Sequence, residues 1–128
     1  MSEGFRDTPA MTVKGLFVNA TDHRDFATGE TIFREGDQGD EMFGVMSGKV
    51  ELRHGDEVVI TVGPDSTFGE MAIISDSRRS LTAVAAEASR IAVINRRTFL
   101  VLVHETPTFA LDVMRSLAER IRDNDRQR

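Results

Sequence analysis

The sequence predicts a mainly β domain with flanking helices, in which an antiparallel jelly-roll or related β barrel is followed by two helices. From residue 25 to 94, short runs rich in β-branched and aromatic residues alternate with turns that contain Gly or Asp. After Asn95, apolar residues recur at helical spacing instead. A chain of 128 residues with 40% hydrophobic residues has the size of one domain and can bury one core without disulfides or metal.

Residues 1–23 mix Thr, Pro, Gly and charged residues around one apolar patch, Val13 to Val18. We expect an N-terminal arm whose patch docks on the main domain, residues 24–128, with the β part at about 25–94. The predicted strands are Thr31–Arg34, Met42–Met46, Lys49–Arg53, Val58–Val62, Ser80–Ala86 and Arg90–Ile94. His54-Gly55-Asp56-Glu57 predicts a hairpin turn, and Ser47-Gly48 predicts a tighter one.

Two helices are predicted at the C-terminal end. The first covers Arg96 to Glu105, and Thr106-Pro107 ends it because a residue before proline avoids helical angles. The second covers about 108–125. Its apolar stripe consists of Phe109, Val113, Met114, Leu117 and Ile121. We expect Phe109 and Val113 to pack on the β part, Met114 and Leu117 to be core residues as well, and the stretch toward Leu117 and Ile121 to act as a lid or a dimer contact.

The segment from Phe68 to Thr82 carries the chemistry of a phosphate and ribose site. Gly69 lets the backbone approach a ligand, and residues 71–74 predict one helical turn whose free N–H groups face an anion. Arg79 can give a phosphate two parallel hydrogen bonds, whereas Glu70 only accepts and therefore suits a sugar hydroxyl. The pattern predicts a nucleotide with an exposed ribose hydroxyl.

Simpler interpretations remain open for each of these residues. Glu70 could be a surface carboxylate near a helix N-terminus. Arg79 could pair with Asp76 on the surface, and Arg78 could be a solvated charge. Gly36, Gly39 and Gly48 are interpreted as turn glycines that adopt positive backbone angles.

The same segment resembles the phosphate-binding cassette of the cyclic-nucleotide-binding domain family, shared by the catabolite activator protein, cyclic-AMP-dependent kinase regulatory subunits and nucleotide-gated channels. The matching residues are Phe68, Gly69, Glu70, Met71, Ala72, Ile73, Arg79, Ser80 and Thr82. A second family signature precedes them in the runs 32–37, 39–43 and 47–50, so the resemblance spans roughly Phe26 to the C-terminus. The chain departs from the pattern where Arg78 replaces Pro, Leu81 replaces Ala and Ala83 replaces Val. If Ser80 faces the ligand from a strand, Leu81 faces away.

The resemblance implies an antiparallel β-roll with a short cassette helix and two C-terminal helices. It places phosphate on Arg79 and the cassette N–H groups and ribose on Glu70. We choose Arg120 for stacking on the base, with Asn124 as a polar alternative. The implied ligand-binding residues are Phe68, Gly69, Glu70, Met71, Ala72, Arg78, Arg79, Ser80, Leu81, Thr82 and Arg120.

The resulting hypothesis is a cyclic nucleotide sensor. Its expected ligand is cyclic AMP, with cyclic GMP as the alternative, and no other cofactor is expected. Its C-terminal helix would close on ligand and signal to an unidentified effector protein or to a second copy, so a homodimer remains open. The alternative is a ligand-free β-roll that acts as a protein-interaction module.

Other functional classes are disfavoured by composition and spacing. The histidines His23, His54 and His104 have no metal-ligand spacing, and no nucleophile stands beside a base, so we expect no enzyme. The net charge of -5 disfavours nonspecific binding to nucleic acid or anionic membranes. No signal pattern or membrane-length apolar run occurs, which predicts a cytoplasmic protein. No helix-turn-helix sequence follows the last helix, so direct DNA binding is not expected.

Overall fold

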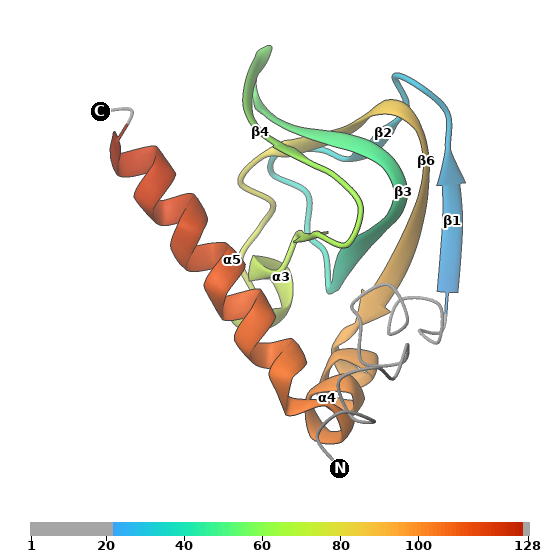
Figure 1. The fold of residues 1–128 in the computed structure, drawn as a ribbon. Coiled ribbons are helices and arrows are strands. Elements are labelled where there is room, and N and C mark those ends of the chain that lie inside the picture. Colours follow the sequence, from blue (N-terminus) through green and yellow to red (C-terminus); the bar gives the residue numbers. More distant parts are fainter. Residues whose placement is uncertain (1–21, 127–128) are drawn as a thin grey trace.

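The computed structural model describes residues 22–126 and confirms a mainly β fold of antiparallel strands with helices (Figure 1). The elements are β1 (Asp22–Phe26), β2 (Thr31–Phe33), β3 (Glu41–His54), β4 (Glu57–Val62), β5 (Thr67–Phe68), α3 (Met71–Ile74), β6 (Thr82–Asn95), α4 (Arg96–Glu105) and α5 (Pro107–Arg126). The apolar patch Val13 to Val18 and nearly all of the predicted arm lie outside the described residues. Residues 22 and 23, assigned to the arm, already belong to β1.

The roll is organised by two long strands, β3 and β6. They pair antiparallel over almost their whole length, from Glu41 opposite Asn95 to Arg53 opposite Thr82. The other edge of β6 binds β2 near its start and β1 near its end, and the other edge of β3 binds β5 near its start and β4 near its end. Two shared strands therefore carry short partners at both ends, which produces the roll seen in Figure 1.

The alternation of side chains along these strands separates two cores. Phe43 and Val93 point into the roll, whereas their neighbours Met42 and Ile94 point toward the helices. The roll interior consists of Phe43, Val45, Val50, Leu52, Val62, Phe68, Ala83, Ile91 and Val93. The second cluster joins the sheet to α3, α4 and α5 through Met42, Ile73, Ala92, Ile94, Leu102, Phe109 and Val113. The helices are thus anchored on the outer face of the roll.

Two predicted strand breaks are wrong. The turn predicted at Ser47-Gly48 is an irregularity inside β3: the register shifts there, and Gly48 has φ +95°. An extra residue in a paired strand bends the strand without reversing it. The separate strands predicted at Ser80–Ala86 and Arg90–Ile94 are one strand, β6, because no turn residue interrupts residues 86–90 and pairing with β3 continues past them.

The sequence analysis also missed the short strands β1 and β5. β1 lacks a β-prone pattern because four of its five residues are charged or polar, yet it pairs with β6 over five residues. β5 has only two residues, both buried against β3. The turn predicted at residues 54–57 is present between β3 and β4.

The helix predictions agree more closely with the structure. Asn95 caps α4, its side-chain oxygen accepting from the Thr98 N–H at 2.8 Å, and Pro107 opens α5, a position where its missing N–H has no cost. Phe109 and Val113 are buried as predicted. Met114, predicted to be a core residue, is 59% exposed, because it follows Val113 by one residue and faces another side of the helix.

The irregularity at Gly48 gives a stability prediction. A Cβ atom on Gly48 would lie 2.2 Å from Ser89 Oγ and 2.6 Å from the Ala88 carbonyl oxygen. We expect Gly48→Ala to lower the free energy of unfolding by about 2–5 kcal/mol, the sum of the positive-φ cost and overpacking. Gly55→Ala is the control: Gly55 has φ +61° with nothing within 4 Å, so it should lose only the backbone cost of about 1–2 kcal/mol. Urea denaturation compares them, and equal losses would contradict the steric argument.

Candidate functional site

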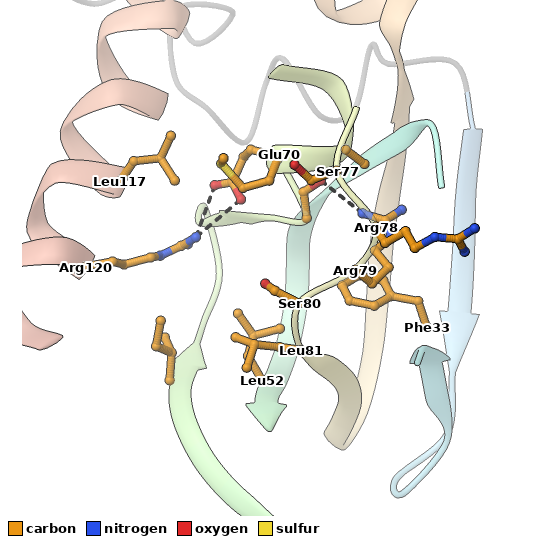
Figure 2. Close-up of a pocket in the computed structure, with 14 residues that line it drawn as sticks. Phe33, Leu52, Glu70, Ser77, Arg78, Arg79, Ser80, Leu81, Leu117 and Arg120 are labelled. Carbon is orange, nitrogen blue, oxygen red and sulfur yellow. Dashed lines mark hydrogen bonds and ion pairs between the residues drawn. The ribbon is translucent and has the colours of Figure 1, made fainter. Parts of the chain in front are cut away.

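A cavity of about 180 Å³ lies where α3, the segment 77–81 and α5 meet the roll (Figure 2). Its walls are Phe33, Leu52, Ile60, Gly69, Glu70, Met71, Ala72, Ser77, Arg78, Arg79, Ser80, Leu81, Leu117 and Arg120. Two charged side chains in this lining are buried, Glu70 at 2% and Arg79 at 8% exposure. Charged side chains are rarely buried in proteins unless they are paired with an opposite charge or bind a ligand or metal, so these two residues define the candidate site.

Backbone carbonyl groups hold the guanidinium of Arg79. Nη1 donates to the Gly69 carbonyl oxygen at 3.0 Å, and Nη2 donates to the Glu41 carbonyl oxygen at 2.8 Å. The guanidinium carbon also lies 4.2 Å from the centre of the Phe33 ring, within cation–π range. No carboxylate oxygen among the described residues forms an ion pair with Arg79.

The charge of Arg79 is therefore incompletely compensated. Burial lowers the pKa of Arg79 below its usual value, and the more distant carboxylates of Glu41, Asp40 and Asp37 oppose that effect. Arg79 Nε is buried without a hydrogen-bond partner among the described residues. An unpaired buried donor costs free energy, about 1–3 kcal/mol in typical cases. A bound anion would satisfy both the charge and the donor.

The platform beneath Arg79 is an aromatic cluster that the sequence analysis did not identify. The rings of Phe33, Phe43 and Phe68 lie with centroids 5.2–6.0 Å apart. β2, β3 and β5 each contribute one ring, and Gly69 follows β5 with φ +76°. The chain thus turns at Gly69 directly from the packed Phe68 into α3.

Glu70 sits at the start of α3 and is bound by α5. Its carboxylate accepts from the Thr67 hydroxyl at 2.9 Å and from Arg120 Nη1 at 3.2 and 3.3 Å. Arg120 Nη2 also donates to the Thr67 carbonyl oxygen. Figure 2 shows Arg120 and Leu117 projecting from α5 toward Glu70. The interpretation of Glu70 as a surface carboxylate is therefore wrong. Arg120, chosen for stacking on the base, forms an ion pair with the Glu70 carboxylate in this structure.

The tertiary structure brings most of the predicted site residues to one cavity. The residues that line it are Gly69, Glu70, Met71, Ala72, Arg78, Arg79, Ser80, Leu81 and Arg120. Phe68 and Thr82 do not line it. Phe68 is fully buried in the roll interior, and the Thr82 hydroxyl accepts from the Glu35 N–H at 3.0 Å, which ties the loop after β2 to the start of β6.

The condition under which Leu81 would face away from the ligand, a strand that includes Ser80, is not met. β6 begins at Thr82, so Ser80 and Leu81 precede the strand and the alternation of strand faces does not apply to them. Both line the cavity, and Leu81 also packs against the roll interior. Arg78 is exposed and donates to the Gly36 carbonyl oxygen at 3.0 Å, while Asp76 binds Arg96 at 2.6 Å and not Arg79.

Five lining residues were not predicted as site residues: Phe33, Leu52, Ile60, Ser77 and Leu117. Leu52 and Ile60 are direct cross-strand partners on β3 and β4. The hairpin turn between β3 and β4 was predicted, and pairing the strands around that turn would have placed the Leu52 and Ile60 side chains on the same face of the sheet. Phe33 and Ser77 carry no local signal of this kind.

Backbone donors and an apolar groove complete the site. The N–H groups of Met71, Ala72 and Ser80 donate to no other described residue. A groove of about 860 Å³ adjoins the cavity between β4, α3 and α5, lined by Val59, Ile60, Thr61, Met71, Ile74, Ser80, Leu81, Leu117, Arg120 and Ile121. The site therefore combines a cationic end, a carboxylate and an apolar extension. No helix within the described part of the chain is long and apolar enough to cross a membrane.

Comparison with known proteins agrees with this arrangement. Residues 23–106 match the family model described as the cyclic nucleotide-binding domain. The chain belongs to this family. The match runs from the second residue of β1 to Thr106, directly after α4, so it covers the roll except Asp22 and includes the cassette.

Relatives of this cyclic nucleotide-binding domain include the cyclic AMP receptor protein of Thermus thermophilus, 35% identical over 115 residues, which are 86% of this chain and 53% of that protein. The cAMP-dependent protein kinase regulatory subunit of Eremothecium gossypii is 38% identical over 86 residues, 67% of this chain and 19% of that protein. A structure solved in work on a cyclic-GMP-dependent signalling pathway of bacterial phytopathogenesis has a TM-score of 0.72 at 28% identity, covering 85% of this chain and 90% of that one. The chain spans about half or less of these two curated relatives.

The Arg120–Glu70 contact gives the second prediction. Arg120→Ala leaves a buried carboxylate with the Thr67 hydroxyl as its remaining donor, and should lower the free energy of unfolding by about 2–3 kcal/mol, less than the roughly 3–5 kcal/mol of a fully buried pair because Arg120 is 18% exposed. Arg115→Ala is the control, because Arg115 is 65% exposed in its pair with Asp112 and should cost less than about 1 kcal/mol. Adding Glu70→Gln to Arg120→Ala should recover part of the loss. Thermal or urea unfolding measures all four proteins, and no recovery would mean that the loss has another origin.

Proposed function

We propose that this domain binds a cyclic mononucleotide, cyclic AMP, in the cavity, and that it acts as a sensor without a catalytic step. The observation that carries the proposal is Arg79, a buried guanidinium whose Nε has no partner among the described residues, on the same cavity as the buried carboxylate of Glu70. One ligand can use both groups, because its phosphate needs donors and its ribose hydroxyl needs an acceptor.

The phosphate is assigned to the end of the cavity nearest Arg79. Two of the five N–H hydrogens of the guanidinium are used by the Gly69 and Glu41 carbonyl groups, which leaves three others, one of them on the buried Nε. The backbone N–H groups of Met71, Ala72 and Ser80, which line the same cavity, supply neutral donors. Charge-assisted hydrogen bonds in a dry site are the strong ones, so this end should contribute most of the binding free energy.

The ribose is assigned to Glu70 and the base to the apolar walls. A carboxylate has about four acceptor positions, so Glu70 can accept from a ribose hydroxyl in addition to Thr67 and Arg120. Leu52, Ile60 and Leu81 form an apolar wall, with Leu117 of α5 on the same cavity. At about 180 Å³ the cavity is smaller than the roughly 300 Å³ at the low end of ligand pockets. The base would therefore extend into the adjoining groove.

Cyclic AMP is preferred because two relatives are named for it and because the base walls are mainly apolar. Cyclic GMP is the competing ligand. The exposed hydroxyl of Ser80 beside Arg79 favours it, as does the likeness to a structure described with a cyclic-GMP-dependent pathway.

Signalling is assigned to α5, which shares the ligand site. Arg120 binds the carboxylate given to the ribose, and Leu117 lines the cavity given to the nucleotide. Ile121, one turn further on, is 63% exposed beside the groove. A base in the groove would bury this apolar face, so ligand would favour a closed α5. An effector protein or a second copy of the chain would then recognise the closed helix.

The second candidate is a ligand-free interaction module. A specific observation favours it: both charged groups of the site already have protein partners, Arg79 on backbone carbonyl groups and Glu70 on Thr67 and Arg120. A titration that detects no nucleotide binding would support this module.

The test of the proposal is titration calorimetry of cyclic AMP and cyclic GMP against wild type, Arg79→Ala and Arg78→Ala. We expect cyclic AMP to bind more tightly than cyclic GMP. Arg79→Ala should weaken binding by about 2–5 kcal/mol, because it removes the buried partner of the phosphate. Arg78 is the control, since it is exposed and contacts the Gly36 carbonyl, and should cost far less. Equal losses in the two variants would mean that the phosphate is not on Arg79.

Closure of α5 has its own test in amide hydrogen exchange. Saturating cyclic AMP should slow exchange around Leu117 to Ile121 and leave the buried start of the helix near Val113 unchanged. By thermodynamic linkage, ending the chain after Ser116 should weaken cyclic AMP binding by the free energy that ligand contributes to closure, about 1–3 kcal/mol. Unchanged exchange together with full affinity in the shortened chain would remove α5 from the signalling proposal.

A further inference from the structure

Gly39 has an unusual reason to be a glycine. Within residues 22–126, the glycines with positive φ are Gly29, Gly36, Gly48, Gly55 and Gly69. Gly39 is not among them, so the interpretation of this residue as a turn glycine with positive φ is wrong. A Cβ atom at position 39 would instead lie 2.4 Å from Arg79 Nη2 and 2.7 Å from both Arg79 Cζ and Nε. The position lacks a side chain where the guanidinium needs the space.

The guanidinium fills a slot built from three separate parts of the chain. The Phe33 ring covers it at 4.2 Å, the Glu41 carbonyl accepts from Nη2, and the Gly69 carbonyl accepts from Nη1. Gly39 lies beside the guanidinium as well, because an added Cβ atom there would fall 2.4 Å from Nη2. Gly69 is also close, since a Cβ there would lie 2.9 Å from Nη1, but its φ of +76° already requires a glycine.

The loop that carries Gly39 cannot easily move away from Arg79, because the two backbones are hydrogen-bonded. The Gly36 N–H donates to the Arg79 carbonyl oxygen at 2.7 Å, and the Arg79 N–H donates to the Asp37 carbonyl oxygen at 2.9 Å. Loop and cassette therefore form one unit. A side chain added at position 39 must displace the end of Arg79, which is flexible, and not the backbone.

We propose that Gly39 is a positioning residue for the anion site. Because residue 39 has no side chain, the Arg79 guanidinium can occupy the space beside it, and any side chain there would displace the guanidinium. The proposal rests on the proposed function for its effect on binding, but its geometric part concerns Arg79 alone. Phosphate binding depends on where the donors point, so a displaced guanidinium should lose affinity even though its charge remains. The backbone cost should be small because Gly39 does not need positive φ, so any loss of stability should come from the contacts of the displaced guanidinium.

The binding experiment compares Gly39→Ala with Gly63→Ala in calorimetric titrations with cyclic AMP. Gly63 is the matched control, since it has no positive φ and a Cβ there would meet nothing within 4 Å. Gly39→Ala should weaken binding about tenfold or more, and Gly63→Ala should not. In an Arg79→Ala background, Gly39→Ala should have no further effect, because its target is gone. Unchanged or tighter binding by Gly39→Ala, or an undiminished effect in that background, would overturn the proposal.

A readout that needs no ligand separates failure of this proposal from failure of the proposed function. The Arg79 Nε–H is buried, so its NMR signal, identified by its loss in Arg79→Ala, should exchange slowly with solvent in wild type and in Gly63→Ala. In Gly39→Ala the signal should shift and exchange faster at a temperature where the variant is still fully folded. An unshifted, slowly exchanging signal would overturn the positioning role whether or not any nucleotide binds. If wild type binds no nucleotide while the signal responds as expected, the proposed function fails and the positioning role stands.

Discussion

The antiparallel pairing of β3 and β6 is the constraint on which the rest of the molecule depends. Because side chains alternate along both strands, one register assigns Phe43, Ile91 and Val93 to the roll interior and Met42, Ala92 and Ile94 to the face that holds the helices. A slip of one residue would exchange the two sets. The aromatic platform under Arg79 and the anchoring of α5 are therefore fixed by the same pairing.

At Gly69 and Glu70 the candidate site connects the aromatic cluster of the roll interior to helix α5. Phe68 belongs to the interior, the positive φ of Gly69 turns the chain, and Glu70 then opens α3 beside α5. Arg79 is held on one side of this turn and Arg120 on the other. A ligand that contacted both charges of the cavity would therefore contact the roll and the last helix together, and in the proposed function this is how binding would change the position of α5.

The two arginines on the cavity are compensated in different ways. Arg120 meets a carboxylate at partial exposure, so its charge is paired. Arg79 is buried against carbonyl dipoles and an aromatic ring, which solvate a cation without neutralising it. A site prepared in this way has little reorganisation left to do when an anion arrives. The adjoining groove is mainly apolar, and the charged residue in its lining is Arg120, which is already paired with Glu70.

The sequence by itself determined the fold class, the helices after Asn95 and the cassette residues around Gly69 to Arg79, because periodicity, capping and local motifs are properties of neighbouring residues. The tertiary structure alone decided that the β3–β6 register shifts at Ser47-Gly48 without a turn, that Ser80 and Leu81 precede β6, and that Met114 is exposed. It alone also placed Arg120 on Glu70, 50 residues away, and Gly39 against Arg79, 40 residues away. Such contacts depend on how distant segments pack, and no local pattern of residue types encodes the space left beside a folded side chain.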